Sequence, residues 1–142
     1  LRMEYPDPYI PRSLTFEIPE RISAEGTIEH PLDEQAVRRL LTEFKTKKIE
    51  AIAVCLLWSI ANPVHEKRIG ELIEEFLPGV PYTLSSEINP ILREYRRASS
   101  TAIDASLKPL MQEYLLTLEK DLRNAGYEND ILVSTSFGGV MH

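Results

Sequence analysis

Helical and strand patterns alternate between residues 33 and 85, and this alternation limits the possible fold more than any other feature. Asp33 can cap the first helix at its N-terminus. The apolar residues of that helix recur at i, i+3, i+4 and i+7, at Val37, Leu40, Leu41 and Phe44. Residues 49–58 predict a strand buried on both faces, Asn62-Pro63 predicts a helix start, and residues 80–85 predict another strand. This order predicts an α/β fold, a layered sheet with flanking helices.

The segments on either side of this pattern are less regular. Residues 1–31 are rich in proline, which favours extended chain, and we expect a β-hairpin between Ser13–Ile18 and residues 27–29. After residue 88, the pattern predicts a helix over 91–107, a second helix that opens at Pro109, and a short strand at 131–133.

We therefore divide the chain into three parts. Residues 1–31 form an extended proline-rich segment with a β-hairpin, and residues 32–88 form an α/β unit. Residues 89–142 form a helical segment followed by a strand. The chain starts at Leu1 and stops just after a glycine pair, and we read both ends as cuts in a longer protein.

Composition excludes several classes of function. The net charge of −6 disfavours a general nucleic-acid binder, which needs a basic face. No apolar run reaches the roughly 20 residues of a membrane span. The single cysteine, Cys55, cannot form an internal disulfide and fits a cytoplasmic location.

Ser136, Gly138 and Gly139 follow directly after the last predicted strand. Glycines let a ligand approach the backbone closely, and hydroxyl and backbone N–H groups can hold a phosphate or an oxyanion. No lysine follows the glycines, so the segment is not a Walker A loop. The alternative is a tight turn that binds no ligand.

Glu87 lies just beyond a predicted strand, where α/β sheets tend to bind ligands, and Arg93 follows on the next segment. An arginine can pair with a phosphate or a carboxylate. The alternative is a solvated helix face on which Glu94 pairs with neighbouring arginines. The histidines are scattered, with no recognised metal spacing, and His65-Glu66 fits a structural role in the first turn of a helix.

Several segments together resemble the hydantoinase A/5-oxoprolinase family, which includes subunits of acetone and acetophenone carboxylases. The matching stretches are Ile52–Ser59, Asn62–Glu66, Leu84–Ile88, Arg93–Thr101, Pro109 and Ser136–Val140. Three positions depart from the family pattern. Phe137 and Asp104 stand where asparagine is common, and Trp58 replaces a common histidine.

The resemblance implies a fragment of an actin/hexokinase-like ATPase architecture that joins the amino-terminal region to the main domain. The longer enzyme would use ATP and Mg²⁺ to phosphorylate the oxygen of a cyclic amide or a ketone enol, with a partner subunit or domain of the hydantoinase B type. Ser136, Gly138 and Gly139 would line the nucleotide or substrate cleft, and Glu87 and Arg93 would lie near the substrate. The D-x-G-G-T phosphate loops of the family are absent from this sequence.

We therefore expect no catalysis by this stretch alone and no cofactor bound to it. Its residues do not identify a catalytic group or a metal ligand. The alternative is a non-catalytic assembly or partner-binding domain, for which the proline-rich residues 1–31 would serve as an arm. A self-sufficient small hydrolase ranks third, because no complete catalytic set of residues is visible.

Overall fold

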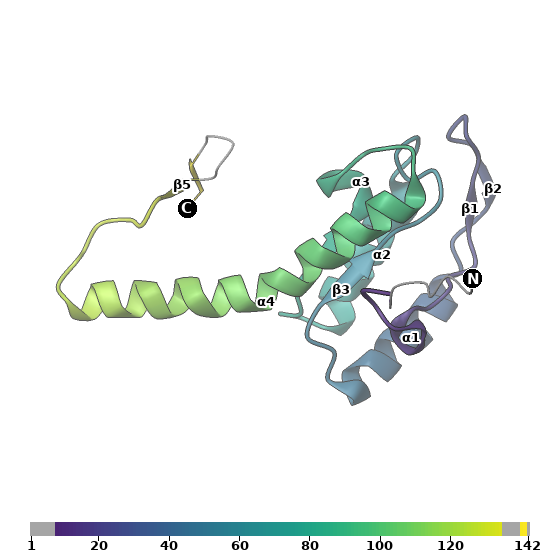
Figure 1. Cartoon of the computed structure of the whole chain (residues 1–142). Helices are drawn as coiled ribbons and strands as arrows, with labels where there is room; N and C mark the ends of the chain where they lie inside the picture. The colour runs from purple at the N-terminus through teal and green to yellow at the C-terminus, as the bar shows by residue number, and fades with distance from the viewer. Residues whose placement is uncertain (1–7, 135–139, 142) are drawn as a thin grey trace, which may run out of the picture. The chain divides into compact units, whose positions relative to one another are not determined.

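The computed structural model describes residues 8–134 and 140–141, and it shows a mixed α/β chain in which helices and strands alternate (Figure 1). In chain order the elements are η1 (Arg12–Leu14), β1 (Arg21–Ile22), β2 (Ile28–His30), α1 (Glu34–Lys47), β3 (Ile52–Val54), α2 (Val64–Phe76), β4 (Tyr82–Leu84), α3 (Ser85–Ile88), α4 (Glu94–Asn124), β5 (Val133–Ser134) and β6 (Val140–Met141).

Helix α1 begins where the sequence predicts it. The Asp33 Oδ1 atom accepts a hydrogen bond of 2.9 Å from the backbone N–H of Ala36, which satisfies one of the free donors at the helix start. The helix ends at Lys47, and the next residue, Lys48, caps it with a left-handed φ of 52°. Its buried residues, Val37, Leu41 and Phe44, confirm the predicted apolar face.

Strands β3 and β4 pair in parallel, with Ile52 opposite Tyr82, and α2 connects them. The prediction of a long strand buried on both faces is wrong, because β3 has three residues and Ala53 is exposed. Beyond β3 the backbone leaves the sheet. The N–H of Leu56 donates to the side chain of Glu66, and Trp58 adopts a left-handed φ of 56°.

The core lies between α1, α2 and the parallel strand pair. Its buried apolar residues are Val37, Leu41, Phe44, Ile52, Val54, Ile69, Leu72, Ile73, Leu77 and Leu84. Phe16 and Ile18 pack against this core, but the predicted strand over Ser13–Ile18 is wrong. The alternating pattern therefore arises because Phe16 and Ile18 point toward the core from a segment that pairs with no strand. The hairpin forms later in the chain, where β1 pairs with β2 in antiparallel fashion.

The chain divides into two compact units after Pro109. Helix α4 continues through Pro109, so the predicted start of a new helix there is wrong. Proline removes one backbone donor, but good helix formers on both sides, such as Ala105 and Met111, support the helix. The second unit contains the last part of α4 and the antiparallel pair of β5 and β6. The three-part division at residues 31 and 88 stays a prediction.

No helix among the described residues is both long enough and apolar enough to cross a membrane.

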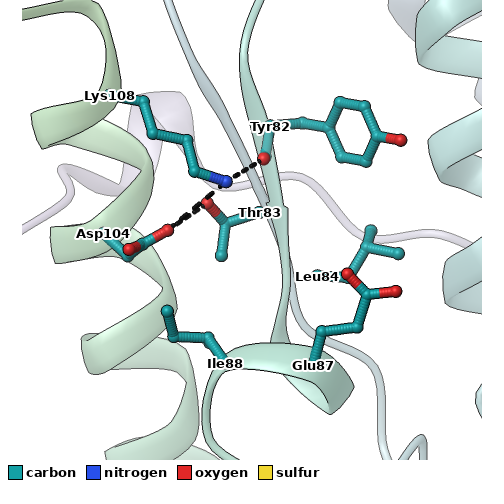
Figure 2. Close-up of a pocket in the computed structure, with 7 residues that line it drawn as sticks. All are labelled: Tyr82, Thr83, Leu84, Glu87, Ile88, Asp104 and Lys108. Carbon is teal, nitrogen blue, oxygen red and sulfur yellow. Dashed lines mark hydrogen bonds and ion pairs between the residues drawn. The ribbon is translucent and has the colours of Figure 1, made fainter. Parts of the chain in front are cut away.

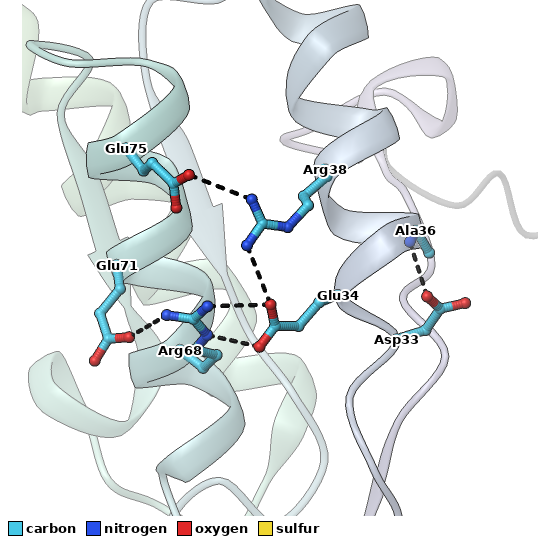
Figure 3. A network of polar contacts seen from close by, with 7 residues as sticks. All are labelled: Asp33, Glu34, Ala36, Arg38, Arg68, Glu71 and Glu75. Carbon is cyan, nitrogen blue, oxygen red and sulfur yellow. Dashed lines mark hydrogen bonds and ion pairs between the residues drawn. The ribbon is translucent and has the colours of Figure 1, made fainter.

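Ion pairs join the solvent-facing sides of α1 and α2 (Figure 3). The Arg68 guanidinium donates to both carboxylate oxygens of Glu34, at 2.7 and 3.1 Å, and to Glu71 at 2.6 Å. Arg38 lies between Glu34 and Glu75, each at 3.3 Å. The hydrogen bond from Arg68, with further help from Arg38, lowers the pKa of Glu34 from 4.5 to about 2.

This pKa shift predicts how the α1–α2 contact depends on pH. The folded-state pKa of Glu34 is lowered, so its contribution to stability is complete above about pH 4.5 and is lost as the pH falls towards 2. Glu34→Gln is expected to lower Tm at pH 7, and its difference from wild type should shrink over this acid range and in high salt. Thermal melts at several pH values test this.

The control is Glu25→Gln, since Glu25 is exposed and forms no ion pair with the described residues. Its Tm should follow wild type at every pH. If Glu34→Gln lowered Tm by the same amount at pH 7 and at pH 2.5, the ion pairs of Glu34 would not be the cause of the loss.

Candidate functional site

A pocket of about 240 Å³ lies beside β4, in the first unit (Figure 2). Residues from β4, α3 and α4 form its walls, namely Tyr82, Thr83, Leu84, Glu87, Ile88, Asp104 and Lys108. It lies at the strand that precedes α3, and the carboxyl ends of parallel strands are where α/β sheets commonly bind ligands. The pocket is therefore our candidate binding site for a small polar molecule in this unit.

Two charged side chains reach from α4 to β4, as Figure 2 shows. Lys108 Nζ donates to the carbonyl oxygen of Tyr82 at 2.5 Å and lies 3.5 Å from Asp104 Oδ2. The Thr83 hydroxyl donates to the same Asp104 oxygen at 2.6 Å. The ammonium group of Lys108 is thus held by a carbonyl oxygen and a carboxylate, which fixes its position against the strand.

The Tyr82 hydroxyl takes no part in the contacts of Asp104 and Lys108 and instead bonds Glu74. It donates to Glu74 at 2.6 Å, and this hydrogen bond, with burial and nearby negative charge, raises the pKa of Tyr82 to about 12. Tyr82 therefore stays protonated at neutral pH and serves as a hydrogen-bond donor. It cannot supply a phenolate base under those conditions.

One of the two predicted substrate residues lies in the pocket wall. Glu87 lines the pocket and is exposed, whereas Arg93 is not among the lining residues. Arg93 contributes its carbonyl oxygen to α4, where the Arg97 N–H donates to it at 3.0 Å. The predicted nucleotide-cleft residues Ser136, Gly138 and Gly139 lie outside the described residues.

A buried polar cluster lies next to the pocket, at the ends of β3 and β4. Its centre is Glu66, which is fully buried. Glu66 Oε1 accepts from the Leu56 N–H at 2.9 Å and from the Ser85 hydroxyl at 2.6 Å, and Oε2 accepts from the Ser86 N–H at 2.9 Å. Because the Ser85 hydrogen is engaged with Glu66, the Ser59 hydroxyl, 3.3 Å away, donates to Ser85.

Arg97 supplies the positive charge of this cluster and is also fully buried. Its Nε donates to the Ser85 hydroxyl at 3.0 Å, and its two terminal nitrogens donate to the carbonyl oxygens of Ile91 and Leu56 at 2.8 and 2.6 Å. The solvated-face interpretation of the arginines is therefore wrong for Arg97. The Ser85 hydroxyl bridges a buried carboxylate and a buried guanidinium.

Sequence reasoning missed Glu66 and Arg97 as buried groups. Glu66 was predicted to favour the helix start by its charge, but its side chain points inward, like that of its neighbour His65. The Nδ1 atom of His65 lies 2.7 Å from Glu20 Oε2, and both side chains are buried. Periodicity could have indicated this, because Glu66 precedes the buried residues Ile69 and Ile73 by three and seven positions.

Comparison with known proteins identifies the relatives of this chain. The model of the hydantoinase/oxoprolinase N-terminal region matches residues 2–77. The chain belongs to the hydantoinase/oxoprolinase family. The pocket and the buried cluster are therefore features of a member of this family, and most of the residues that form them follow the matched region.

The relatives extend the match beyond residue 77. An uncharacterized protein of Methanocaldococcus jannaschii is 39% identical over 140 residues, which cover 99% of this chain and 21% of that protein. The acetophenone carboxylase gamma subunit of Aromatoleum aromaticum is 36% identical over 94% of this chain and 19% of its own length. This chain therefore spans about a fifth of the length of these relatives.

A solved structure shares the fold. The crystal structure of the ATP-dependent caprolactamase from Pseudomonas jessenii matches with a TM-score of 0.85 and 31% identity. The match covers 99% of this chain and 20% of the caprolactamase chain. The likeness thus includes the α4 region, which lies outside the family match.

The pocket beside β4 does not fit the phosphates of ATP. The pocket carries two carboxylates, Glu87 and Asp104, which repel phosphate, and its ammonium group is already held by Tyr82 and Asp104. Among the described residues, no group of three or more His, Cys, Asp or Glu side chains could hold a metal ion. The pocket suits a ligand with N–H donors better than it suits a phosphate.

Proposed function

We propose that this chain is part of a cytoplasmic ATP-dependent enzyme that acts on a cyclic amide or a ketone. The likeness to an ATP-dependent caprolactamase over 99% of the chain carries this proposal, and the match to a ketone carboxylase subunit supports it. In the complete enzyme, which would have an actin/hexokinase-like architecture, ATP would activate the amide or enol oxygen by phosphorylation. Hydrolysis or carboxylation would follow, with a partner of the hydantoinase B type.

Within this proposal, the chain contributes binding surfaces and does no chemistry alone. Glu87, which lines the pocket, would accept a hydrogen bond from the substrate. Arg93 would lie near the substrate, as the family resemblance implies. Ser136, Gly138 and Gly139 would line the nucleotide or substrate cleft. The groups that move protons and phosphoryl oxygens would come from other parts of the enzyme.

ADP release tests the proposal. The product of the natural gene, together with its hydantoinase B type partner, is incubated with ATP, Mg²⁺ and bicarbonate and with caprolactam, 5-oxoproline, acetone or acetophenone. The 142-residue chain is assayed in parallel. We expect substrate-dependent ADP release from the gene product and none from the chain alone. A gene product that releases no ADP with any amide or ketone would overturn the proposal.

The cleft assignment gives a sharper prediction. Gly139→Val in the gene product should reduce turnover at least tenfold, because a branched side chain blocks close approach of a ligand to the backbone. The Tm of the variant is the control and should change by only a few degrees. Losses of activity and of folding that run in parallel would refute the role of Gly139.

A second candidate, a non-catalytic assembly domain, is favoured by one feature of the second unit. None of residues 110–133 is buried, and the part of α4 in this unit exposes large apolar side chains, namely Leu110, Met111, Tyr114 and Leu116. An apolar helix surface of this kind commonly contacts another protein. Association with a hydantoinase B type subunit that does not depend on nucleotide would favour this candidate, and nucleotide-dependent activity would favour the first.

A further inference from the structure

The segment of residues 85–93 carries both predicted substrate residues, Glu87 and Arg93, but has little regular structure of its own. Helix α3 is a single turn, and residues 89–93 lie outside any helix or strand. The backbone bonds within the segment run from the N–H of Asn89 to Ser85 at 3.3 Å and from the N–H of Ile91 to Asn89 at 2.7 Å. So short a helix is not stable by itself, because nucleation is unfavourable.

Buried side chains from outside the segment hold it at both ends. At the start, Glu66 accepts from the Ser85 hydroxyl at 2.6 Å and from the Ser86 N–H at 2.9 Å. Near the end, the Arg97 guanidinium donates to the Ile91 carbonyl oxygen at 2.8 Å. The conformation of the segment thus depends on two charged residues of neighbouring helices, α2 and α4.

The charges make this arrangement selective for one conformation. Glu66 and Arg97 are both fully buried, and the Ser85 hydroxyl lies between them. If the segment moved away, the carboxylate would lose two donors and the guanidinium would lose two acceptors. Buried charged groups that lose their partners are costly, so the closed arrangement is strongly preferred.

We propose that Glu66, Ser85 and Arg97 are positioning residues that fix the segment of residues 85–93 and thereby place Glu87 in the wall of the pocket. The link to substrate rests on the proposed function, in which Glu87 binds it. A site fixed before binding loses less conformational freedom when the ligand arrives. The three residues act through Glu87 and the backbone and do not themselves line the pocket.

Amide hydrogen exchange on the 142-residue chain tests the positioning role, with Ser85→Ala as the variant. The change removes the hydroxyl bridge and leaves the Arg97 Nε without its acceptor. We expect protection of the Ser86, Asn89 and Ile91 amides to fall by about tenfold, the cost of one unsatisfied buried donor. The amides of α1 should lose clearly less, because the opening is local.

Ser59→Ala is the matched control, because Ser59 is a buried serine that contacts Ser85 but neither charge. In Ser59→Ala, the amides of Ser86, Asn89 and Ile91 should keep their wild-type protection within about threefold. Equal losses over the segment and α1 in Ser85→Ala would show that the hydroxyl contributes only to global stability. Unchanged protection would show that the segment does not depend on it. Either result would overturn the proposal.

Kinetics of the natural gene product test the link to substrate. Ser85→Ala should raise KM for the amide or ketone by about tenfold and leave KM for ATP unchanged, whereas Ser59→Ala should change neither. If Ser85→Ala changed KM for the amide or ketone and KM for ATP equally, Ser85 would not act by placing Glu87 in the pocket wall. If wild type shows no ATP-coupled activity, the proposed function fails, and hydrogen exchange alone decides whether the three residues fix the segment.

Discussion

Arg97→Met is expected to lower the free energy of unfolding by about 3–5 kcal/mol, because it leaves the Ser85 hydroxyl and the carbonyl oxygens of Ile91 and Leu56 without their shared donor. Arg97 and Glu66 are both fully buried, and the Ser85 hydroxyl bridges them. Methionine fills much of the space of the arginine stem but cannot donate to the carbonyl oxygens of Ile91 and Leu56. Urea unfolding followed by circular dichroism measures the change.

Arg96→Met is the matched control, since Arg96 is the adjacent arginine and is exposed. It should change the free energy of unfolding by no more than about 0.5 kcal/mol. The double variant Glu66→Gln with Arg97→Met should lose less than the sum of the single variants, because it removes both charges. A loss below about 1 kcal/mol for Arg97→Met, or strict additivity, would mean that the two charges do not depend on each other.

Leu72→Ala should lower the free energy of unfolding by about 2–5 kcal/mol, because it removes a large apolar side chain from the core and leaves a cavity. Leu72 is fully buried on α2, beside Ile73, in the core that α1, α2 and the strand pair share. The midpoint of urea unfolding should fall while the m-value stays constant.

Leu116→Ala provides the comparison, because Leu116 has the same side chain but is 68% exposed. Its effect should lie within about 0.5 kcal/mol. Equal effects of the two substitutions would indicate that the packing around Leu72 does not stabilise the first unit.

Local sequence patterns were sufficient to predict most of the helices and strands in the first unit. The spacing of Val37, Leu41 and Phe44 predicts the buried face of α1, and Asp33 caps it as expected. Asn62 and Pro63 place the start of α2 within a residue, since the Asn62 side chain accepts from the Val64 N–H at 3.2 Å. These signals are local because a helix start needs only its own first turn.

Local patterns failed where a distant contact decided the outcome. The strand at residues 49–58 was predicted too long, because the backbone after Val54 turns to bond Glu66, ten residues beyond Leu56. The break at Pro109 was wrong, because one missing donor does not end a helix whose neighbours favour it. Glu87 was placed at a strand end, and the structure adds Asp104 and Lys108 to the same pocket.

The sequence by itself determined the order of helices and strands from α1 to β4, the apolar faces of α1 and α2, and the family. Only the tertiary structure decided that Glu66 and Arg97 are buried together, and that Ser85 lies between them. The physical reason is that periodicity reports which face of one element avoids water. The burial of a charge depends instead on partners that other parts of the chain supply, and here those partners are 6 to 41 residues away.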